Sequence, residues 1–189
     1  ALTGNLAWAI GQFSGIEHAR CTFATKFDYV DELLDVEHGG HTQMRISVNP
    51  SEIIKKAEIG TSTLEGRIEA ANKMYGAGYK IGINVAPIVL KDNWKEQYSQ
   101  LLDDLREKLD DGIKETSFFE LIFMTYGLAN EKINEAALPG TLNIFEKEKM
   151  KPKGRGKYRY KPDITIEAEE FFRNQIAVKF PRAVISYIV

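Results

Sequence analysis

The stretch KIGINVAPIVL, residues 80–90, decides the fold class. It is an almost continuous apolar run, and Gly76 and Gly78 stand shortly before it. Such a run is typical of a strand that is covered on both faces inside a parallel sheet, whereas a half-solvated strand alternates apolar and polar residues. We therefore predict a buried parallel strand here.

The segments around this strand alternate between helical and strand periodicity. STLEGRIEAANKMYGAGY, residues 62–79, reads as a helix with a capping box of Ser62 and Glu65. DYVDELLDV, residues 28–36, offers a short helical turn with Asp28 as its N-cap. Further helices are predicted at residues 4–19, 93–112 and 166–181, and further strands at residues 21–27, 43–49, 117–126 and 182–189. Strand–helix alternation through residue 126 predicts an α/β fold with right-handed crossovers and a parallel sheet.

The composition excludes several classes of protein, among them disulfide-rich and membrane-spanning ones. The chain has 189 residues, 43% of them hydrophobic, and a formal net charge of −2, which predicts a globular domain without a general affinity for nucleic acid. A single cysteine, Cys21, excludes an internal disulfide framework or a cysteine-ligated metal cluster built from this chain, and fits a reducing, cytoplasmic setting. No apolar run reaches the roughly 18 residues of a membrane span, so we expect no membrane partner.

The stretch KEKMKPKGRGKYRYK, residues 147–161, concentrates positive charge. Gly154 and Gly156 bracket Arg155, as the tip of a hairpin requires, and Tyr158 and Tyr160 interleave with the cations that follow. Cations fall on every second position of the stretch: Lys147, Lys149, Lys151, Lys153, Arg155, Lys157, Arg159 and Lys161. In a strand the cations would face one way and the tyrosines the other. This pattern favours a basic hairpin that contacts nucleic acid, and the alternative is a solvated loop.

Polar residues stand where the predicted strands end. Lys26 closes the first strand, Ser47 and Asn49 close the second, and Asn84 and Ala86 lie near the end of the third. Because the carboxyl ends of parallel strands line the site in βα architectures, these residues could bind a polar small molecule with carboxylate or ribose groups. The alternative is that Lys26 is solvated while the other side chains only terminate strands. His38 and His41 in EHGGH fit an exposed loop better than a metal pair.

Four motifs together carry a family resemblance. They are T-K-F at residues 25–27, R-x-S-x-N at 45–49, R-x-E-A-A-x-K-x-x-x-A-G-Y at 67–79 and N-V-A-P-I at 84–88, and the ending FFRNQIAVKFPRAVISYIV at 171–189 supports them. With these motifs, nearly the whole chain resembles the spore photoproduct lyase family, radical S-adenosylmethionine (SAM) enzymes that repair a thymine dimer in DNA.

The resemblance implies a fold and a site. The fold would be a partial (β/α) barrel over residues 1–126, with a C-terminal extension over residues 127–189 that carries the basic hairpin (about 147–161), a helix and a closing strand and packs with the barrel as one unit. Carried over by motif, the SAM-binding residues would be Lys26, Ser47, Asn49 and Ala86. The DNA-binding residues would be Lys153, Arg155, Lys157 and Tyr158.

The resemblance also implies an activity and partners. The intact enzyme would reverse 5-thyminyl-5,6-dihydrothymine to two thymines by SAM-derived radical chemistry. This chain lacks the C-x-x-x-C-x-x-C motif of the family, so the ligands of a [4Fe–4S] cluster would lie outside it and no metal ligand is expected within it. The expected partners are damaged double-stranded DNA and an N-terminal portion of the same enzyme, without which this chain would be inactive. We assign no catalytic residue from the sequence.

Two departures from the family pattern keep other functions open. The hairpin reads GRGKY where the family tends to read G-R-Y-G-x-G-K-Y, and the strand FFELIFMTY lacks the His-Arg-Phe-Thr that often follows F-E-L-I. One alternative is therefore a radical SAM relative that acts on another substrate. The other is a non-enzymatic module that binds DNA or a protein on the same scaffold.

Overall fold

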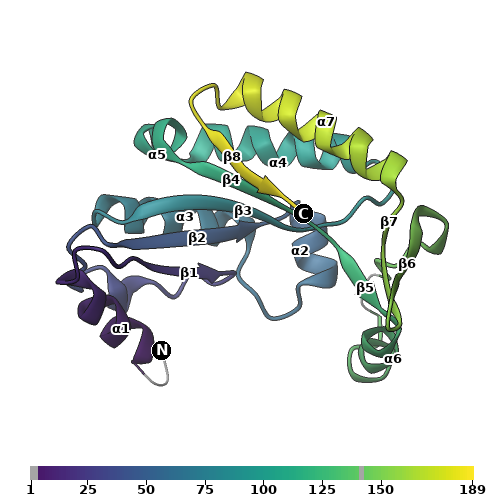
Figure 1. Ribbon diagram of the computed structural model, residues 1–189, viewed down its shortest axis with the longest axis horizontal. Helices are drawn as coiled ribbons and strands as arrows, with labels where there is room; N and C mark the ends of the chain where they lie inside the picture. The colour runs from purple at the N-terminus through teal and green to yellow at the C-terminus, as the bar shows by residue number, and fades with distance from the viewer. Residues whose placement is uncertain (1–3, 141–142) are drawn as a thin grey trace.

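A computed structural model describes residues 4–140 and 143–189 of the chain. Its main sheet has five parallel strands in the order β1-β2-β3-β4-β8 (Figure 1). The bounds are Cys21–Thr25 for β1, Thr42–Val48 for β2, Lys80–Ile88 for β3, Phe118–Phe123 for β4 and Val184–Ile188 for β8. The predicted α/β fold with a parallel sheet is confirmed, and the strand predicted at the end of the chain joins the sheet beside β4.

Helices pack on one face of this sheet. Figure 1 shows α3 and α4 behind the strands, with α7 packed against α4. The strand side chains on that face are apolar and buried, such as Met44, Ile83 and Phe119, because they form the core with these helices. The bounds are Asn5–Ser14 for α1, Ser51–Ala57 for α2, Leu64–Gly76 for α3, Trp94–Lys108 for α4, Asp111–Thr116 for α5, Leu128–Ala137 for α6 and Pro162–Lys179 for α7. The core therefore lies between the helices and one side of the sheet.

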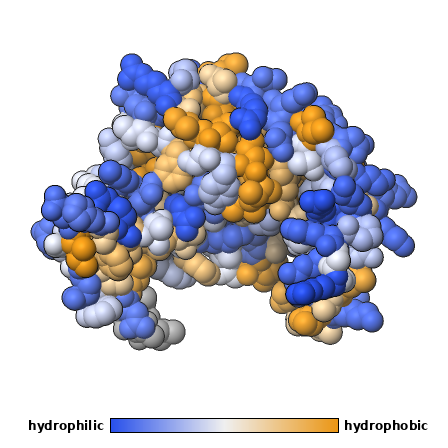
Figure 2. All heavy atoms as spheres, in the orientation of Figure 1, coloured by the Kyte–Doolittle hydropathy of each residue, from blue (hydrophilic) through white to orange (hydrophobic). Residues whose placement is uncertain are grey.

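A second, antiparallel sheet projects from the carboxyl end of the first. Its strand order is β5-β7-β6, with bounds Thr125–Gly127 for β5, Met150–Gly154 for β6 and Lys157–Tyr160 for β7. The predicted boundary between the barrel and the C-terminal extension, at residue 126, falls within β5. Figure 2 shows the resulting arch, in which the end that carries α1 and the end that carries α6 and the hairpin project on either side of a hollow.

The tip of the hairpin lies where the sequence predicts it, but the hairpin strands span fewer residues than the alternating cations do. Gly154, Arg155 and Gly156 all have positive φ (101°, 51° and 70°), which a tight turn between β6 and β7 requires. Of the alternating cations, Lys147 and Lys149 lie instead in a 3₁₀ turn, and Lys161 is the residue before α7. Strand alternation therefore applies only to the cations of β6 and β7.

Several local predictions are wrong at the ends of elements. The first helix ends at Ser14 rather than at residue 19. Thr63, not Ser62, caps α3 by accepting a hydrogen bond from the N–H of Gly66, and the Ser62 hydroxyl donates instead to Asp28. Asp28 caps no helix, because residues 31–33 form only a 3₁₀ turn without a side-chain cap. The helix α6 was not predicted.

Candidate functional site

The carboxylate of Glu58, one residue beyond the end of α2, gathers three of the polar side chains at the carboxyl edge of the sheet. Its Oε1 accepts hydrogen bonds from Lys26 Nζ at 2.5 Å and from Asn49 Nδ2 at 2.8 Å. Its Oε2 accepts from Arg67 Nη2 at 2.6 Å. We call these four residues the Glu58 cluster. Lys26 and Asn49, predicted from separate strand ends, thus meet on one acceptor.

Further hydrogen bonds fix Lys26 and Asn49 of the Glu58 cluster. Lys26 follows β1, and its carbonyl accepts from the N–H of Ser62 at 3.1 Å. Asn49 follows β2, donates to the carbonyl of Pro87 at 3.0 Å and accepts from the hydroxyl of Tyr98 at 3.0 Å. Since each contact joins a different element, the cluster ties β1, β2, β3 and α4 together at one edge.

Arg67, which is fully buried on α3, makes the largest number of these contacts. Besides Glu58 it donates to the carbonyls of Ser62 and Ser47, both at 2.9 Å, and to the hydroxyl of Thr61 at 2.7 Å. A buried guanidinium needs acceptors for its donors, and Arg67 finds them on β2 and on residues 58–62 between α2 and α3. It therefore holds Glu58 in place from the side opposite Lys26.

The charges of the cluster favour an ionised Glu58. Burial acts to raise the pKa of this carboxyl, but hydrogen bonds from Lys26, Asn49 and Arg67 outweigh it and hold the pKa below its ordinary value. Two cations face this one carboxylate, and the Lys26 side chain is 30% exposed. Lys26 can therefore also reach an anionic group on a ligand.

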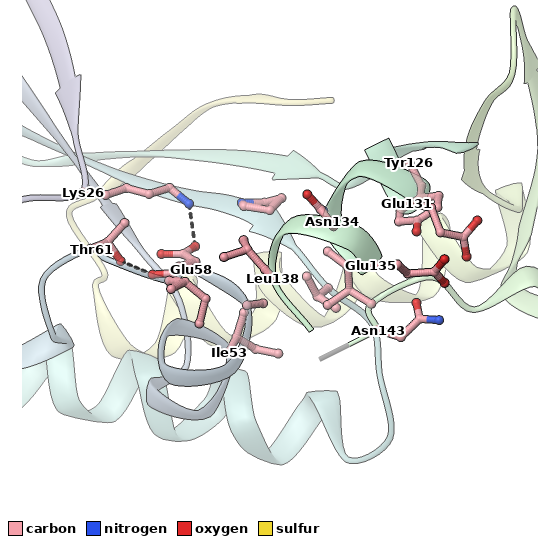
Figure 3. A pocket seen from close by; sticks show the side chains of 15 residues that line it. Lys26, Ile53, Glu58, Thr61, Tyr126, Glu131, Asn134, Glu135, Leu138 and Asn143 are labelled. Atoms are coloured by element: carbon pink, nitrogen blue, oxygen red, sulfur yellow. Dashed lines mark hydrogen bonds and ion pairs between the residues drawn. The ribbon is translucent and has the colours of Figure 1, made fainter. Parts of the chain in front are cut away.

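A cavity of about 340 Å³ opens beside Lys26, within the size range of small-molecule sites. Figure 3 shows Lys26, Glu58 and Thr61 on one side of it and Asn134 of α6, with Leu138 just after that helix, on the other. Tyr126 also lines it, and burial together with the charge of Glu131 raises the pKa of Tyr126 to about 12. The phenol therefore stays protonated at neutral pH.

Ser47 and Ala86 lie beside the Glu58 cluster on the sheet itself. The carbonyl of Ser47 accepts from Arg67, while its hydroxyl lies 3.5 Å from Asn84 Nδ2 on the face opposite the helices. Ala86 is half-buried on the same face of β3, immediately before Pro87. The four predicted cofactor residues are thus neighbours, although only Lys26 among them lines the cavity.

The predicted DNA-binding residues divide between two faces of the hairpin. Lys153, Arg155 and Lys157 are exposed at its tip. Tyr158 is half-buried and pairs across the sheet with Tyr126, and its ring packs edge-on against Phe145 with centroids 5.3 Å apart. Tyr158 therefore packs on the side of the hairpin that faces Phe145, while the cations face solvent.

Lys151, Lys153 and Arg159 line a groove of about 420 Å³ between the hairpin and the start of α7. Lys151 and Arg159 are directly paired across β6 and β7, so their positive charges lie next to each other. The sequence alternation identified these cations but not the groove, because the position of α7 depends on long-range packing.

Glu58 and Arg67 were not predicted as site residues. Arg67 is the first residue of the R-x-E-A-A motif. The motif therefore included this residue but did not indicate that it binds Glu58. Within residues 4–140 and 143–189, no three His, Cys, Asp or Glu side chains lie close enough together to hold a metal ion. Over the same residues, no helix has the length and hydrophobicity that crossing a bilayer demands.

Comparison with known proteins identifies the family of this chain. A family model described as "Spore photoproduct lyase" matches residues 1–189. The chain belongs to the spore photoproduct lyase family. Among curated proteins, the spore photoproduct lyases of Clostridium acetobutylicum and Bacillus subtilis are 39% and 37% identical to it over 191 and 190 residues. These alignments cover 99% and 98% of this chain but 56% of each relative, so the chain spans little more than half of their length.

Solved structures of the spore photoproduct lyase family share the fold. A mutant spore photoproduct lyase with bound AdoMet and dinucleoside spore photoproduct is 35% identical and superposes with a TM-score of 0.92. A spore photoproduct lyase complexed with dinucleoside spore photoproduct gives the same identity and TM-score. Each alignment covers 100% of this chain and 56% of the other.

Proposed function

We propose that this chain is the part of a spore photoproduct lyase that binds SAM and damaged DNA. The complete enzyme would reverse 5-thyminyl-5,6-dihydrothymine to two thymines, together with an N-terminal portion that carries the ligands of a [4Fe–4S] cluster. When bound, SAM supplies the radical chemistry, and the residues of this chain position it and the substrate. The chain spans 56% of relatives with this name, and related structures hold AdoMet and dinucleoside spore photoproduct.

The single observation that carries this proposal is the Glu58 cluster. Arg67 already neutralises Glu58 from one side, so Lys26 is available for the carboxylate of SAM. Ser47 and Ala86 lie next to it on the polar face of the sheet, where a hydroxyl and a backbone can contact ribose and base. The donor and acceptor types therefore fit SAM.

The hairpin supports the DNA-binding half of the proposal. Lys153, Arg155 and Lys157 present three exposed cations at a tip, and Lys151 and Arg159 extend the positive charge toward α7. Phosphate groups are bound by such clusters irrespective of base sequence. The hairpin would thus hold the DNA strand while the sheet holds the cofactor.

The test is SAM binding by isothermal titration calorimetry to the purified chain. Lys26→Met should weaken binding about tenfold or more, because a hydrogen bond between charged groups is lost. Lys56→Met is the matched control, since Lys56 pairs with Glu52 at 2.6 Å on an exposed helix face. Absence of SAM binding to the wild-type chain would favour the non-enzymatic module, and equal affinities of wild type and Lys26→Met would remove Lys26 from the site.

A further inference from the structure

A row of polar side chains crosses the middle of the sheet on the face opposite the helices. The strand register places Ser47, Asn84, Glu120 and Tyr187 next to one another on β2, β3, β4 and β8. Arg45 lies two residues before Ser47 on β2, opposite Gly82 of β3. Since side chains two residues apart share a face, Arg45 lies on the same side as the row.

Arg45 is held across the sheet. Its Nη1 lies 3.3 and 3.4 Å from the two carboxylate oxygens of Glu120, two strands away. Gly82, which is opposite Arg45 on β3, has the ring of Phe118 from β4 packed over it. Tyr187 adjoins this pair, and burial, followed by the charge of Glu120, raises the pKa of its phenol. The pair fixes the guanidinium over β3, beside Asn84.

Two polar atoms of this arrangement have unused hydrogen-bonding capacity. Asn84 is 6% exposed, yet its Oδ1 finds no partner among the described residues. The same holds for Nε of Arg45. A buried polar atom without a partner costs stability, so such atoms mark places where a ligand completes the bonding. One atom is an acceptor and the other a donor.

We propose that Asn84 and Arg45 read the hydrogen-bonding edge of a nucleobase. Asn84 Oδ1 accepts a base N–H, and the guanidinium of Arg45 donates to the neighbouring base oxygen or ring nitrogen. Both a thymine imide and the amino edge of adenine have this pattern. The inference rests on the proposed function, whose substrate and cofactor each carry such a base, and assigns the base contact to two residues outside the Glu58 cluster.

The test follows the side-chain amide of Asn84 by NMR in the ¹⁵N-labelled chain, with thymidine and adenosine as separate ligands. N3-methylthymidine and N6,N6-dimethyladenosine are the matched controls, because methylation removes the hydrogen that Asn84 Oδ1 would accept. One nucleoside should shift the amide signal and lose affinity about tenfold or more on methylation. The nucleoside that responds identifies thymine or adenine as the base.

Three variants separate recognition of the base from effects on stability. Asn84→Leu should lose this affinity and raise the thermal unfolding midpoint by about 2–4 °C, because it removes an unpaired buried group. Asn72→Leu should lower the midpoint, because Asn72 makes hydrogen bonds to Lys108 and Asp110 through both ends of its amide. Arg45→Lys keeps the charge beside Glu120 but removes the planar donor, and should also weaken binding.

The proposal is overturned if neither nucleoside binds, if methylation leaves both affinities unchanged, or if Asn84→Leu binds as the wild type does. Nucleosides lack the amino-acid carboxylate for which Lys26 is proposed. SAM binding that depends on Lys26 would therefore survive such a failure, and the proposed function with it.

Discussion

Replacing Glu58 by glutamine is the sharpest test of how the site is held together. The change keeps the shape of the side chain but removes its charge and one of its two acceptor oxygens. Three donors converge on these oxygens, from Lys26, Asn49 and Arg67, at 2.5 to 2.8 Å. In the variant, the new amide N–H₂ must face at least one of these donors.

The magnitude follows from the burial of the partners. Breaking a buried ion pair by removing one partner costs roughly 3–5 kcal/mol of unfolding free energy. Arg67 keeps its three other acceptors, and Lys26 is partly exposed to water, so the lower end applies. We expect a loss of about 3 kcal/mol, which for a chain of this size lowers the thermal midpoint by about 6–12 °C.

The loss should depend on pH in a defined direction. Because the pKa of Glu58 in the folded chain is below its ordinary value of 4.5, the carboxylate contributes its full stability above about pH 4.5. That contribution disappears as the pH falls through the lower, folded pKa. The difference between wild type and Glu58→Gln should therefore be complete at pH 7 and shrink in more acidic solution.

The assay is urea unfolding of both proteins, monitored by circular dichroism, at a series of pH values from 7 downward. Glu52→Gln is the control, since Glu52 accepts from Lys56 at 2.6 Å but is exposed, and it should leave the midpoint nearly unchanged. A Glu58→Gln variant that is as stable as the control at pH 7, or a difference that grows in acid, would refute this account of the cluster.

Two further predictions concern the hairpin and α4. Replacing Lys153, Arg155 and Lys157 together by alanine should reduce the slope of log K for DNA against log salt by about 2.7, at about 0.9 per phosphate contact. A control triple of lysines elsewhere, each paired with a carboxylate, should keep the slope; it consists of Lys95, Lys108 and Lys114. Tyr98→Phe should cost about 1–3 kcal/mol in urea unfolding, because the hydroxyl is fully buried and serves both the N–H of Val89 and Asn49. The exposed Tyr29→Phe should cost nothing measurable; equal stability of the two variants would contradict the role of that hydroxyl.

The strands could be predicted because buried strands have apolar residues in their local sequence. The run at residues 80–90 is largely apolar because Ile81, Ile83 and Val85 of β3 face the helices in the core, between β2 and β4. Helix α6 was missed for another reason: it buries no residue, and Leu128 and Ile133 are its only large apolar side chains. Cap positions also shifted, since Ser62 and Thr63 are adjacent and only tertiary contact with Asp28 decides between them.

The candidate site could be predicted only in part because its central residue has partners from distant segments. Lys26 and Asn49 were identified as strand ends, and the parallel sheet brings strand ends to one edge. Nothing local marks Glu58, whose partners lie 32 and 9 residues away along the chain. Its role depends on Arg67, which is buried only once α3 has packed on β2.

Arg67 also explains why a lysine rather than a second arginine suits the position of Lys26. Four hydrogen bonds to fixed acceptors hold the guanidinium of Arg67, which makes Glu58 a rigid anion at the edge of the sheet. A flexible ammonium can remain on that anion and still turn toward a ligand carboxylate, because its three donors rotate freely. The buried pair thus supplies rigidity, and the exposed cation supplies the adjustable contact, so exchanging Lys26 for arginine should tighten the cluster and weaken SAM binding together.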